Sequence, residues 1–546
     1  MAPTPAAPQP PAAGSLGLLA LVLSLGGGCG YLYASCGAGA ADSLPAAGGG
    51  AAASWASNGI SESSSGTLFR AVRVRTYAGP RPFANWRAPP PAHATPPACK
   101  SWAVTTTIFA PTTTVKQIAS LPDWCLVIAG DKKSPREYNV SGKHTHYLSP
   151  DDQERLPFAT KKLLRWNHFG RKNLGFLYAI QQGARWVYDT DDDNELQSLV
   201  HGIPVPRPST PVEEVATSHP LYNLYAQMST NPQAWPRGFP LEAIKDNRTN
   251  SASFTRRAWP ARHLGVIQSL ADHDPDVDGI YRLTQPLPFT FPAAGATAVA
   301  AAAAAAGLAG RRLHEEEAGA PLPSSAPPPG DTSPGRRLAK LGATAKSAAK
   351  AGGGKAGGGG KAGGGGKVAR MAAIANKLAG KGGGHRGEGH HRLVSLRPGT
   401  MMPYNAQATL HSYEALWGLL LPCTVHGRVT DIWRAYFTQR LLWDIGSRVA
   451  FSTPWVTQYR NAHNYLGDFN SEVPLYQQAG ELVKALLRWE PTSSTLPGRI
   501  EELYILMYEM SLLGLNDVKL AQAWLADLVH VGYKFPTLVK GAGGAA

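Results

Sequence analysis

The segment Ala184-Arg-Trp-Val-Tyr-Asp-Thr-Asp-Asp-Asp-Asn194 decides the fold of this chain. Its apolar run, from Trp186 to Tyr188, is typical of a buried β-strand. Four aspartates follow within five positions: Asp189, Asp191, Asp192 and Asp193. Because ligands of open α/β sheets bind beyond the carboxyl ends of the strands, this pattern predicts a strand that carries acidic groups to a ligand site.

Carboxylates this close repel one another, so the cluster is typical of a site that binds a cation. Mg²⁺ and Mn²⁺ prefer oxygen ligands, and Mg²⁺ is often held by one or two carboxylates together with water and phosphate oxygens. We therefore expect Asp191 and Asp193 to bind Mn²⁺ or Mg²⁺ that bridges a diphosphate, with Asp189 or Asp192 in a supporting position. A solvated acidic turn is the alternative.

Other uses of the aspartates conflict with the sequence. A calcium-binding EF-hand loop that starts at Asp189 would need Gly and Glu where the chain has Asn194 and Val200. A phosphatase motif of the DxDx(T/V) type would need Thr or Val at position 193, which is Asp. The sequence contains no Gly-x-Ser-x-Gly nucleophile elbow and no Walker loop. A metal–diphosphate site remains the simplest account of the cluster.

A helix is predicted directly before the acidic strand. Leu174, Leu177 and Tyr178 recur at helical spacing, and Gly183 suits the left-handed residue that often follows a helix. A basic turn stands at the start of this helix and consists of Arg171, Lys172 and Asn173. Free N–H groups at a helix N-terminus and basic side chains attract phosphate, so we expect this turn to bind the phosphates of a donor. A solvated basic face is the alternative.

Two further strands are predicted upstream, over residues 102–109 and 124–131, with a helix between Thr112 and Leu121. This β-α-β order, followed by a second helix and strand, predicts an α/β fold with a Rossmann-like sheet. We expect polar residues at the ends of these two strands to line a nucleoside pocket: Thr105, Thr106, Thr107 and Asp131.

Several stretches resemble the STELLO family of glycosyltransferases, most specifically Trp235-Pro-Arg-Gly-Phe-Pro-Leu-Glu242 and Gly265-Val-Ile-Gln-Ser-Leu-Ala-Asp272. The resemblance spans most of residues 99–490 and is interrupted once. It implies a GT-A-like catalytic domain, a nucleotide-sugar donor and a glycan or glycoprotein acceptor. It also implies Golgi residence through an N-terminal membrane anchor and, in land plants, association with cellulose synthase. A scaffold or assembly factor for such a complex is therefore the alternative function.

A catalytic base is expected in the C-terminal half of the chain. Asp431, followed by Gln439-Arg440 and Trp443, is similar in order to the acidic base and Gln-x-x-Arg-Trp motif of processive β-glycosyltransferases. An inverting transferase needs a carboxylate that removes the proton of the acceptor hydroxyl, and Asp431 is the first candidate. Asp468 is the second. The alternative for Asp431 is that it caps a helix.

Composition separates the folded part from the rest of the chain. Residues 293–393 are dominated by Ala, Gly and Lys, so they bury too little apolar surface and are predicted to be a disordered insertion. Residues 301–392 hold fifteen Lys and Arg against five Asp and Glu, so ten of the fifteen net positive charges lie there. A basic loop of this kind could touch anionic lipid or acidic polysaccharide, or it could be inert. Nucleic-acid binding is not expected, because no aromatic residues interleave with the lysines.

The N-terminus carries an apolar run from Leu16 to Leu25. It is marginal for a membrane span and long enough for a signal-peptide core. The family resemblance favours an uncleaved anchor, which would make the chain a single-pass type II Golgi membrane protein with a lumenal catalytic domain. Two glycosylation sequons, Asn139-Val-Ser141 and Asn247-Arg-Thr249, agree with lumenal exposure. Cys125 is expected to be a small core residue.

The expected organisation is therefore an anchor, a stem, a nucleotide-sugar-binding part, the insertion, and an acceptor-side part of the same domain whose C-terminal end is helical. These parts correspond to residues 1–40, 41–98, 99–292, 293–393 and 394–546.

Overall fold

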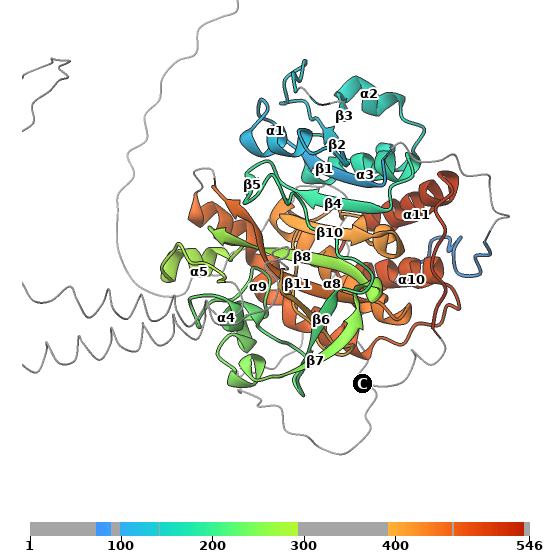
Figure 1. Cartoon of the computed structure of the whole chain (residues 1–546). Coiled ribbons are helices and arrows are strands. Elements are labelled where there is room, and N and C mark those ends of the chain that lie inside the picture. The colour runs from blue at the N-terminus through green and yellow to red at the C-terminus, as the bar shows by residue number, and fades with distance from the viewer. Residues whose placement is uncertain are drawn as a thin grey trace, which may run out of the picture. The chain divides into compact units, whose positions relative to one another are not determined.

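An eleven-stranded mixed sheet organises the part of the chain that the computed structural model describes, which comprises residues 73–88, 99–140, 142, 144–292, 391–460 and 464–539. Ten strands follow the order β3-β2-β1-β4-β10-β8-β11-β9-β6-β7, and β5 pairs with β11 beside this path. Figure 1 shows this order from the top of the view to the bottom. The predicted anchor and nearly all of the predicted insertion lie outside the described residues, and no described helix is long and apolar enough to cross a membrane.

The N-terminal half of the sheet is parallel. Its strands and helices are β1 (Ser101–Thr106), α1 (Thr113–Ala119), β2 (Trp124–Ala129), β3 (Thr145–Leu148), α2 (Pro150–Arg155), α3 (Lys172–Gln181) and β4 (Trp186–Thr190). Strand β1 pairs in parallel with both β2 and β4, so the carboxyl ends of these three strands share one edge. The predicted order of strands and helices is confirmed, although β1 ends at Thr106, three residues before the expected boundary.

The rest of the sheet mixes both directions. It contains β5 (Asn194–Leu196), β6 (Pro211–Ala216), β7 (Ser253–Pro260), β8 (Leu264–His273), β9 (Leu393–Leu396), β10 (Ala408–Ser412) and β11 (Arg448–Gln458). Strand β10 runs antiparallel to β4 and β8, while β11 runs parallel to β8. The carboxyl ends of β8 and β11 therefore meet the same edge as those of β1, β2 and β4, and the start of β10 lies there too.

Helices cover the sheet on both faces. Besides those already named, the α-helices of the described part are α4 (Leu224–Met228), α5 (Gly279–Thr284), α8 (Gly427–Asp444), α9 (Tyr465–Arg488), α10 (Leu496–Glu509) and α11 (Leu515–His530). The last four form the predicted helical C-terminal part. An α/β fold with a mixed sheet flanked by helices is confirmed, and it agrees with a GT-A-like arrangement.

Alternation along β1 and β2 divides the core between the two faces. Val104 and Val127 pack in the larger cluster with the apolar side of α3, whereas Ala103 and Leu126 pack with α1 on the other face. Full burial of a valine or leucine side chain contributes roughly 1.5–3 kcal/mol. Gly175 in α3 allows the closest approach, because a Cβ at that position would lie 2.7 Å from a methyl carbon of Val104.

One covalent link was not predicted. Cys99, two residues before β1, forms a disulfide with Cys125 in β2. Cys125 is buried, as expected, but it is not simply a small core residue. Disulfides persist in oxidising compartments such as the secretory pathway, so this bond bears on where the protein resides.

Candidate functional site

A polar cavity of about 420 Å³ opens at the shared edge of the sheet. Its volume lies in the range typical of sites for small molecules. Two groups of residues line it. The first group is called here the motif side. It comes from the end of β1, the loops after β1 and β2, the segment before α3, and the acidic stretch after β4. Its members are Thr106, Thr107, Ile108, Phe109, Asp131, Lys133, Asn167, His168, Phe169, Asp191, Asp192 and Asp193.

The second group, called here the network side, comes from segments that are far apart in the sequence. Its members are Arg237, Asp276, Gln407, Arg428, Asp431, Gln458 and Arg460. Asp276 follows β8, Gln407 precedes β10, and Gln458 and Arg460 stand at the end of β11. The sheet topology brings Asp276, Gln407, Gln458 and Arg460 to the aspartates that follow β4, and α8 adds Arg428 and Asp431.

The acidic motif divides into a structural residue and three cavity residues. Asp189 is fully buried, and its carboxylate meets Lys172 Nζ at 2.7 Å and Arg434 Nη1 at 2.6 Å. Two cations of the protein therefore neutralise Asp189, which does not line the cavity. Lys172 also lies 3.2 Å from Asp191, so Asp189 and Asp191 share one buried lysine.

The other three aspartates have fewer positively charged partners than Asp189. Burial raises the pKa of Asp191 to about 7, and its acidic neighbours add to the rise against the opposing effect of Lys172. Burial also raises the pKa of Asp192 and Asp193. Asp192 accepts a hydrogen bond from the Thr107 hydroxyl, and Asp193 accepts one from Gln458 Nε2 at 3.2 Å. The cluster thus resists ionisation in the absence of a further cation.

The charges that line the cavity are unequal on the two sides. The motif side has four aspartates against one lysine, whereas the network side has three arginines against two aspartates. The lining as a whole therefore carries two negative charges in excess, concentrated after β4. Carboxylate oxygens in such surroundings suit Mg²⁺ or Mn²⁺.

The cluster is not a closed metal cage. Among the described residues, three potential ligand atoms converge within 4.8 Å only at Cys99, Cys125 and His144, where the two sulfurs are joined in the disulfide. Mg²⁺ sites commonly use one or two carboxylates and take the remaining ligands from water and substrate phosphates. Asp191 and Asp193 fit that open type of site.

The loops after β1 and β2 shape the motif side. The Asp131 carboxylate accepts hydrogen bonds from the backbone N–H groups of Lys132, Asn167 and His168 at 2.7–3.1 Å, so it fixes the loop that lines the cavity. Ile108 and Phe109 are each about half exposed at the cavity. Of the predicted nucleoside residues, Thr106, Thr107 and Asp131 line the cavity, and Thr105 is buried outside it.

The basic turn differs from the prediction. Arg171, Lys172 and Asn173 are buried and are absent from the cavity lining. The Arg171 guanidinium donates to Gln153 at 2.9 Å and stacks on Trp166. The Asn173 amide exchanges two hydrogen bonds with the backbone of Leu421. These side chains fasten the start of α3 to its neighbours, and none of them faces a phosphate in the cavity.

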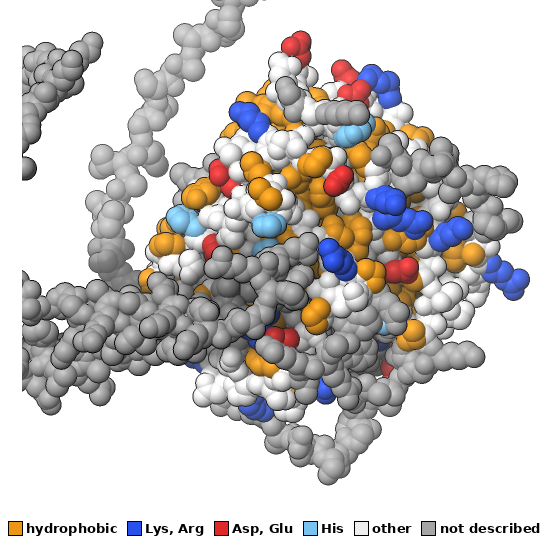
Figure 2. Space-filling model, in the orientation of Figure 1, with side chains coloured by type: hydrophobic (Ala, Val, Ile, Leu, Met, Phe, Trp, Pro, Cys, Tyr) orange, Lys and Arg blue, Asp and Glu red, His pale blue; other side chains and the backbone are white. Residues whose placement is uncertain are grey.

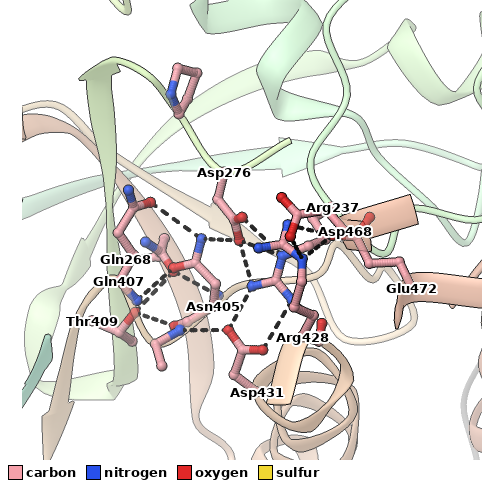
Figure 3. A network of polar contacts seen from close by, with 12 residues as sticks. Arg237, Gln268, Asp276, Asn405, Gln407, Thr409, Arg428, Asp431, Asp468 and Glu472 are labelled. Carbon is pink, nitrogen blue, oxygen red and sulfur yellow. Dashed lines mark hydrogen bonds and ion pairs between the residues drawn. The ribbon is translucent and has the colours of Figure 1, made fainter. Parts of the chain in front are cut away.

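An arginine with two carboxylate partners forms the centre of the network side (Figure 3). Arg237 binds Asp276 through Nε at 2.9 Å and Nη2 at 2.8 Å, and it binds Asp431 at 2.9 and 3.1 Å. Burial alone would raise the pKa of Asp276, but the Arg237 guanidinium holds it below its ordinary range. The backbone N–H of Ala406 also donates to Asp431 at 3.1 Å.

Asp431 lies inside α8, whose N-cap is His426, so the prediction that Asp431 caps this helix is wrong. Asp468, the second candidate base, lies in the first turn of α9 and is not part of the cavity lining. Asp468 instead lies 3.4 Å from Arg460 and 3.6 Å from Arg428. Of the two candidates, only Asp431 reaches the cavity.

The similarity to the Gln-x-x-Arg-Trp motif does not place those residues at the cavity. Gln439 binds the backbone of Met402, and Arg440 binds Asp444 and the backbone carbonyl of Leu486. Both side chains connect α8 to neighbouring segments within the core. The residues that sequence reasoning missed are Arg237, Asp276, Gln407, Arg428, Gln458 and Arg460. The family resemblance was the available signal for four of them. Arg237, Asp276, Gln407 and Arg428 lie in stretches that carry it, which are Trp235–Ile244, Gly265–Thr284, Pro403–Pro422 and Val425–Gly446.

Comparison with known proteins supports the resemblance to the STELLO family. A family model described as STELLO glycosyltransferases matches residues 428–543, which include α8 and the helices after it. Probable glycosyltransferase STELLO2 of Arabidopsis thaliana is 25% identical over 451 residues, which cover 81% of this chain and 46% of that protein. The chain is thus similar to STELLO glycosyltransferases over most of its length, and its C-terminal part matches the model of that family.

A second relative from this family agrees. Probable glycosyltransferase STELLO1 of Arabidopsis thaliana is 24% identical over 475 residues, or 84% of this chain and 49% of that protein. The chain spans about half the length of these curated STELLO relatives. The alignments cover most of this chain, whereas the STELLO family model itself covers only its C-terminal part.

Proposed function

We propose that this protein is a metal-dependent glycosyltransferase that uses a nucleotide-sugar donor. The observation that carries the proposal is the acidic motif side of the cavity, where Asp191, Asp192 and Asp193 gather at the carboxyl edge of the sheet. Their surplus negative charge favours a divalent cation, and the cavity is large enough for a small ligand. The names of the two STELLO relatives support the same reaction class.

Asp191 and Asp193 would hold Mn²⁺ or Mg²⁺, and Asp192 would support them through its bond to Thr107. The bound cation would act as a Lewis acid that stabilises charge on the departing nucleoside diphosphate. The ammonium group of Lys172 is buried between Asp189 and Asp191, so it holds the Asp191 carboxylate in position. Asp189 thus has a positioning role in this proposal.

The nucleoside would lie against the loops after β1 and β2. Ile108 and Phe109 offer exposed apolar surface to a base, and Thr106 and Asp131 provide oxygen atoms near a ribose. Asp131 contributes chiefly by holding the loop at Asn167 and His168. This division leaves the network side for the sugar, the acceptor and the charge of the leaving group.

Asp431 would be the catalytic base for an acceptor hydroxyl. Its carboxylate lines the cavity and is oriented by Arg237 and by the N–H of Ala406. Asp276 holds Arg237 from its other edge and so positions the base indirectly. A carboxylate fixed in this way is pre-oriented toward an acceptor hydroxyl in the cavity, as general-base catalysis requires.

We further propose a lumenal site in the Golgi, with a membrane anchor supplied by the N-terminal segment. The Cys99–Cys125 disulfide supports an oxidising compartment. Asn139 and Asn247 of the two sequons are exposed, as glycosylation requires. On the face shown in Figure 2, basic and acidic side chains are interspersed among apolar ones rather than gathered into a nucleic-acid surface. A cellulose synthase-type complex remains the proposed partner.

The test is thermal stabilisation of the full-length protein by a panel of nucleoside diphosphates and nucleotide sugars, each with and without Mn²⁺. The proposal predicts metal-dependent stabilisation by one nucleotide, with loss of the effect in the Asp191→Asn/Asp193→Asn variant. An exposed pair of aspartates, Asp123 and Asp151, provides a matched Asp→Asn control outside the cavity. A well-folded protein that responds to no nucleotide would contradict the proposal and favour the scaffold function.

A further inference from the structure

Arg460 on the network side is a buried cation with too few partners. Its side chain is only 7% exposed, yet it lines the cavity. Its one hydrogen bond to a described residue joins Nη2 to Asp468 at 3.4 Å, which is long for a charge-assisted bond. Its buried Nε has no acceptor among the described residues. A buried guanidinium usually satisfies its donors, so this one has capacity for an acceptor from outside the chain.

The surroundings of Arg460 are already rich in positive charge. Burial lowers the pKa of Arg460 to about 10, and Arg282 and Arg428 contribute to the shift. Arg428 does not compete for an anion in the cavity to the same degree, because it is paired with Glu472. An anion that entered the cavity would therefore gain more from Arg460 than from its neighbour.

The fold places Arg460 beside the acidic motif. Strand β11 runs antiparallel to β5, which begins directly after the three aspartates, and Gln458 stands opposite Asn194. Asp193 accepts a hydrogen bond from the Gln458 side chain, and its backbone carbonyl accepts one from Tyr459 N–H at 3.2 Å. Arg460 is the next residue along the chain. A ligand bound through a cation at Asp193 would thus present its remaining charge close to Arg460.

We propose that Arg460 binds the diphosphate of the donor beside the acidic motif, so that the leaving group would contact both Arg460 and the cation at Asp191 and Asp193. This inference rests on the proposed function. A guanidinium fits phosphate oxygens in a forked, two-bond geometry that an ammonium cannot reproduce. The contact would neutralise charge that develops on the nucleoside diphosphate as the sugar departs.

Two anionic groups could use the same guanidinium: the phosphates of the donor or the carboxylate of an acidic sugar. The phosphates are favoured because Gln458 and Tyr459 tie this part of the chain to Asp193, where the diphosphate would be held through the cation. An acidic sugar would place its carboxylate beyond the diphosphate. Binding of pyrophosphate and binding of glucuronate distinguish the phosphates from the carboxylate.

The experiment compares the full-length wild-type protein with Arg460→Gln and Arg460→Lys. Titration calorimetry would measure binding of Mn²⁺ alone, and then of inorganic pyrophosphate, uridine diphosphate, guanosine diphosphate and glucuronate in the presence of Mn²⁺. We expect Arg460→Gln to weaken binding of pyrophosphate and of the preferred diphosphate by about 10- to 100-fold. Affinity for Mn²⁺ alone should stay the same or rise, because a nearby positive charge is removed.

Arg460→Lys should recover only part of the lost affinity, since it restores the charge without the fork. Arg155→Gln is the matched control, because Arg155 is 71% exposed and lies outside the cavity. Arg460→Lys also serves if Arg460→Gln does not fold, in which case a loss of diphosphate affinity with unchanged Mn²⁺ affinity still supports the inference.

The outcomes that overturn the inference are distinct from failure of the proposed function. Equal diphosphate affinity in the wild-type protein and Arg460→Gln would remove Arg460 from the leaving-group site while leaving the proposed function intact. A selective loss of glucuronate binding would assign Arg460 to an acidic sugar instead. If the wild-type protein shows no Mn²⁺-dependent diphosphate binding, the proposed function fails, and this inference fails with it.

Discussion

The two sides of the cavity differ in how far apart their residues lie in the sequence and in the sign of their net charge. The motif side draws three of its four aspartates from one short stretch after β4 and the fourth, Asp131, from the loop after β2. These four aspartates face a single lysine. The network side draws its residues from segments up to 223 positions apart, from Arg237 to Arg460, and its three arginines face two aspartates. The difference suggests complementary tasks, in which one side receives a cation and the other receives an anion and holds a base.

The contrast also runs through the acidic motif itself. Asp189 is neutralised by Lys172 and Arg434 and belongs to the core, whereas Asp191 and Asp193 face the cavity. Adjacent residues in one motif therefore serve stability and ligand binding separately. Substitutions at these positions can separate the two tasks.

The largest expected effect is on stability. Asp189→Asn removes the charge that neutralises buried Lys172 and Arg434. Breaking a buried ion pair typically costs about 3–5 kcal/mol, so the free energy of unfolding should fall by that amount. Urea denaturation followed by tryptophan fluorescence would measure it. A loss below about 1 kcal/mol would show that Asp189 is not the structural member of the motif.

On the network side the expected effect is on rate. Asp431→Asn keeps the shape of the side chain but removes the proton acceptor, so turnover of a nucleotide sugar should fall by about 10²- to 10⁴-fold. Transfer to water, seen as donor hydrolysis, provides an assay before the acceptor is known. Binding of the Mn²⁺–nucleotide complex should persist. Unchanged hydrolysis together with intact binding would exclude Asp431 as the base.

Packing beneath the motif side gives a smaller effect. In Gly175→Ala the added methyl group would meet a Val104 methyl carbon at 2.7 Å. Overpacking of a tight core costs about 1–3 kcal/mol, which would outweigh the gain in helix propensity of roughly 1 kcal/mol. The thermal midpoint should therefore fall. A Gly480→Ala variant provides a contrast in α9, where the nearest atoms belong to the flexible end of Glu242.

The pH dependence of the metal-free protein follows from Asp191. Its folded-state pKa of about 7 exceeds its ordinary value of 3.8, so the native state binds more protons than the unfolded state between these limits. Its contribution to stability is thus present at low pH and is lost as the pH rises through 7. The side chain is 36% exposed, so solvent limits the effect to about 1 kcal/mol.

Asp191→Asn should accordingly stabilise the metal-free protein at pH 8 but not at pH 4, and added Mn²⁺ should remove its advantage. Thermal midpoints at both pH values, with and without Mn²⁺, would check this. A variant that is less stable than the wild type at pH 8 without metal would contradict the view that the motif side lacks a cation.

The smallest effect concerns the surface. Asn139→Gln and Asn247→Gln alter exposed residues, so stability should change by no more than about 0.5 kcal/mol. Each substitution should nevertheless remove one glycan from protein made in a secretory host, seen as a shift on a gel that matches glycosidase treatment. Protein from that host that carries no glycan at either position would weigh against lumenal exposure.

Local sequence predicted the strand and the helix that precede the acidic motif, because their geometry is local. The strand-to-aspartate order and the helix that ends at Gln181 follow from periodicity, and Gly183 has the expected positive φ of 84°. The direction of the basic turn could not be predicted in this way. The Arg171 side chain is buried because it contacts Gln153 and Trp166 in the fold. The sequence around Arg171 does not indicate these contacts.

The network side was largely beyond prediction for the same reason. Asp276, Gln407 and Arg460 become neighbours only through the pairing of β8, β10 and β11. The Cys99–Cys125 bond likewise depends on the parallel pairing of β1 and β2, which brings two cysteines 26 positions apart together. Residues that belong to no local sequence pattern can be assigned to a site or a bond only when the order of the strands in the sheet is known.

The most direct test of the account is the thermodynamic coupling between cation and nucleotide. The affinity of the full-length protein for Mn²⁺ would be measured with and without the nucleoside diphosphate that binds best, and the reverse titration would check reciprocity. We predict that each ligand tightens the other at least about tenfold, and that Asp191→Asn/Asp193→Asn abolishes the coupling while the fold persists. Independent binding of the two ligands, or coupling that survives in the variant, would contradict the assignment of the motif side as the metal–diphosphate site.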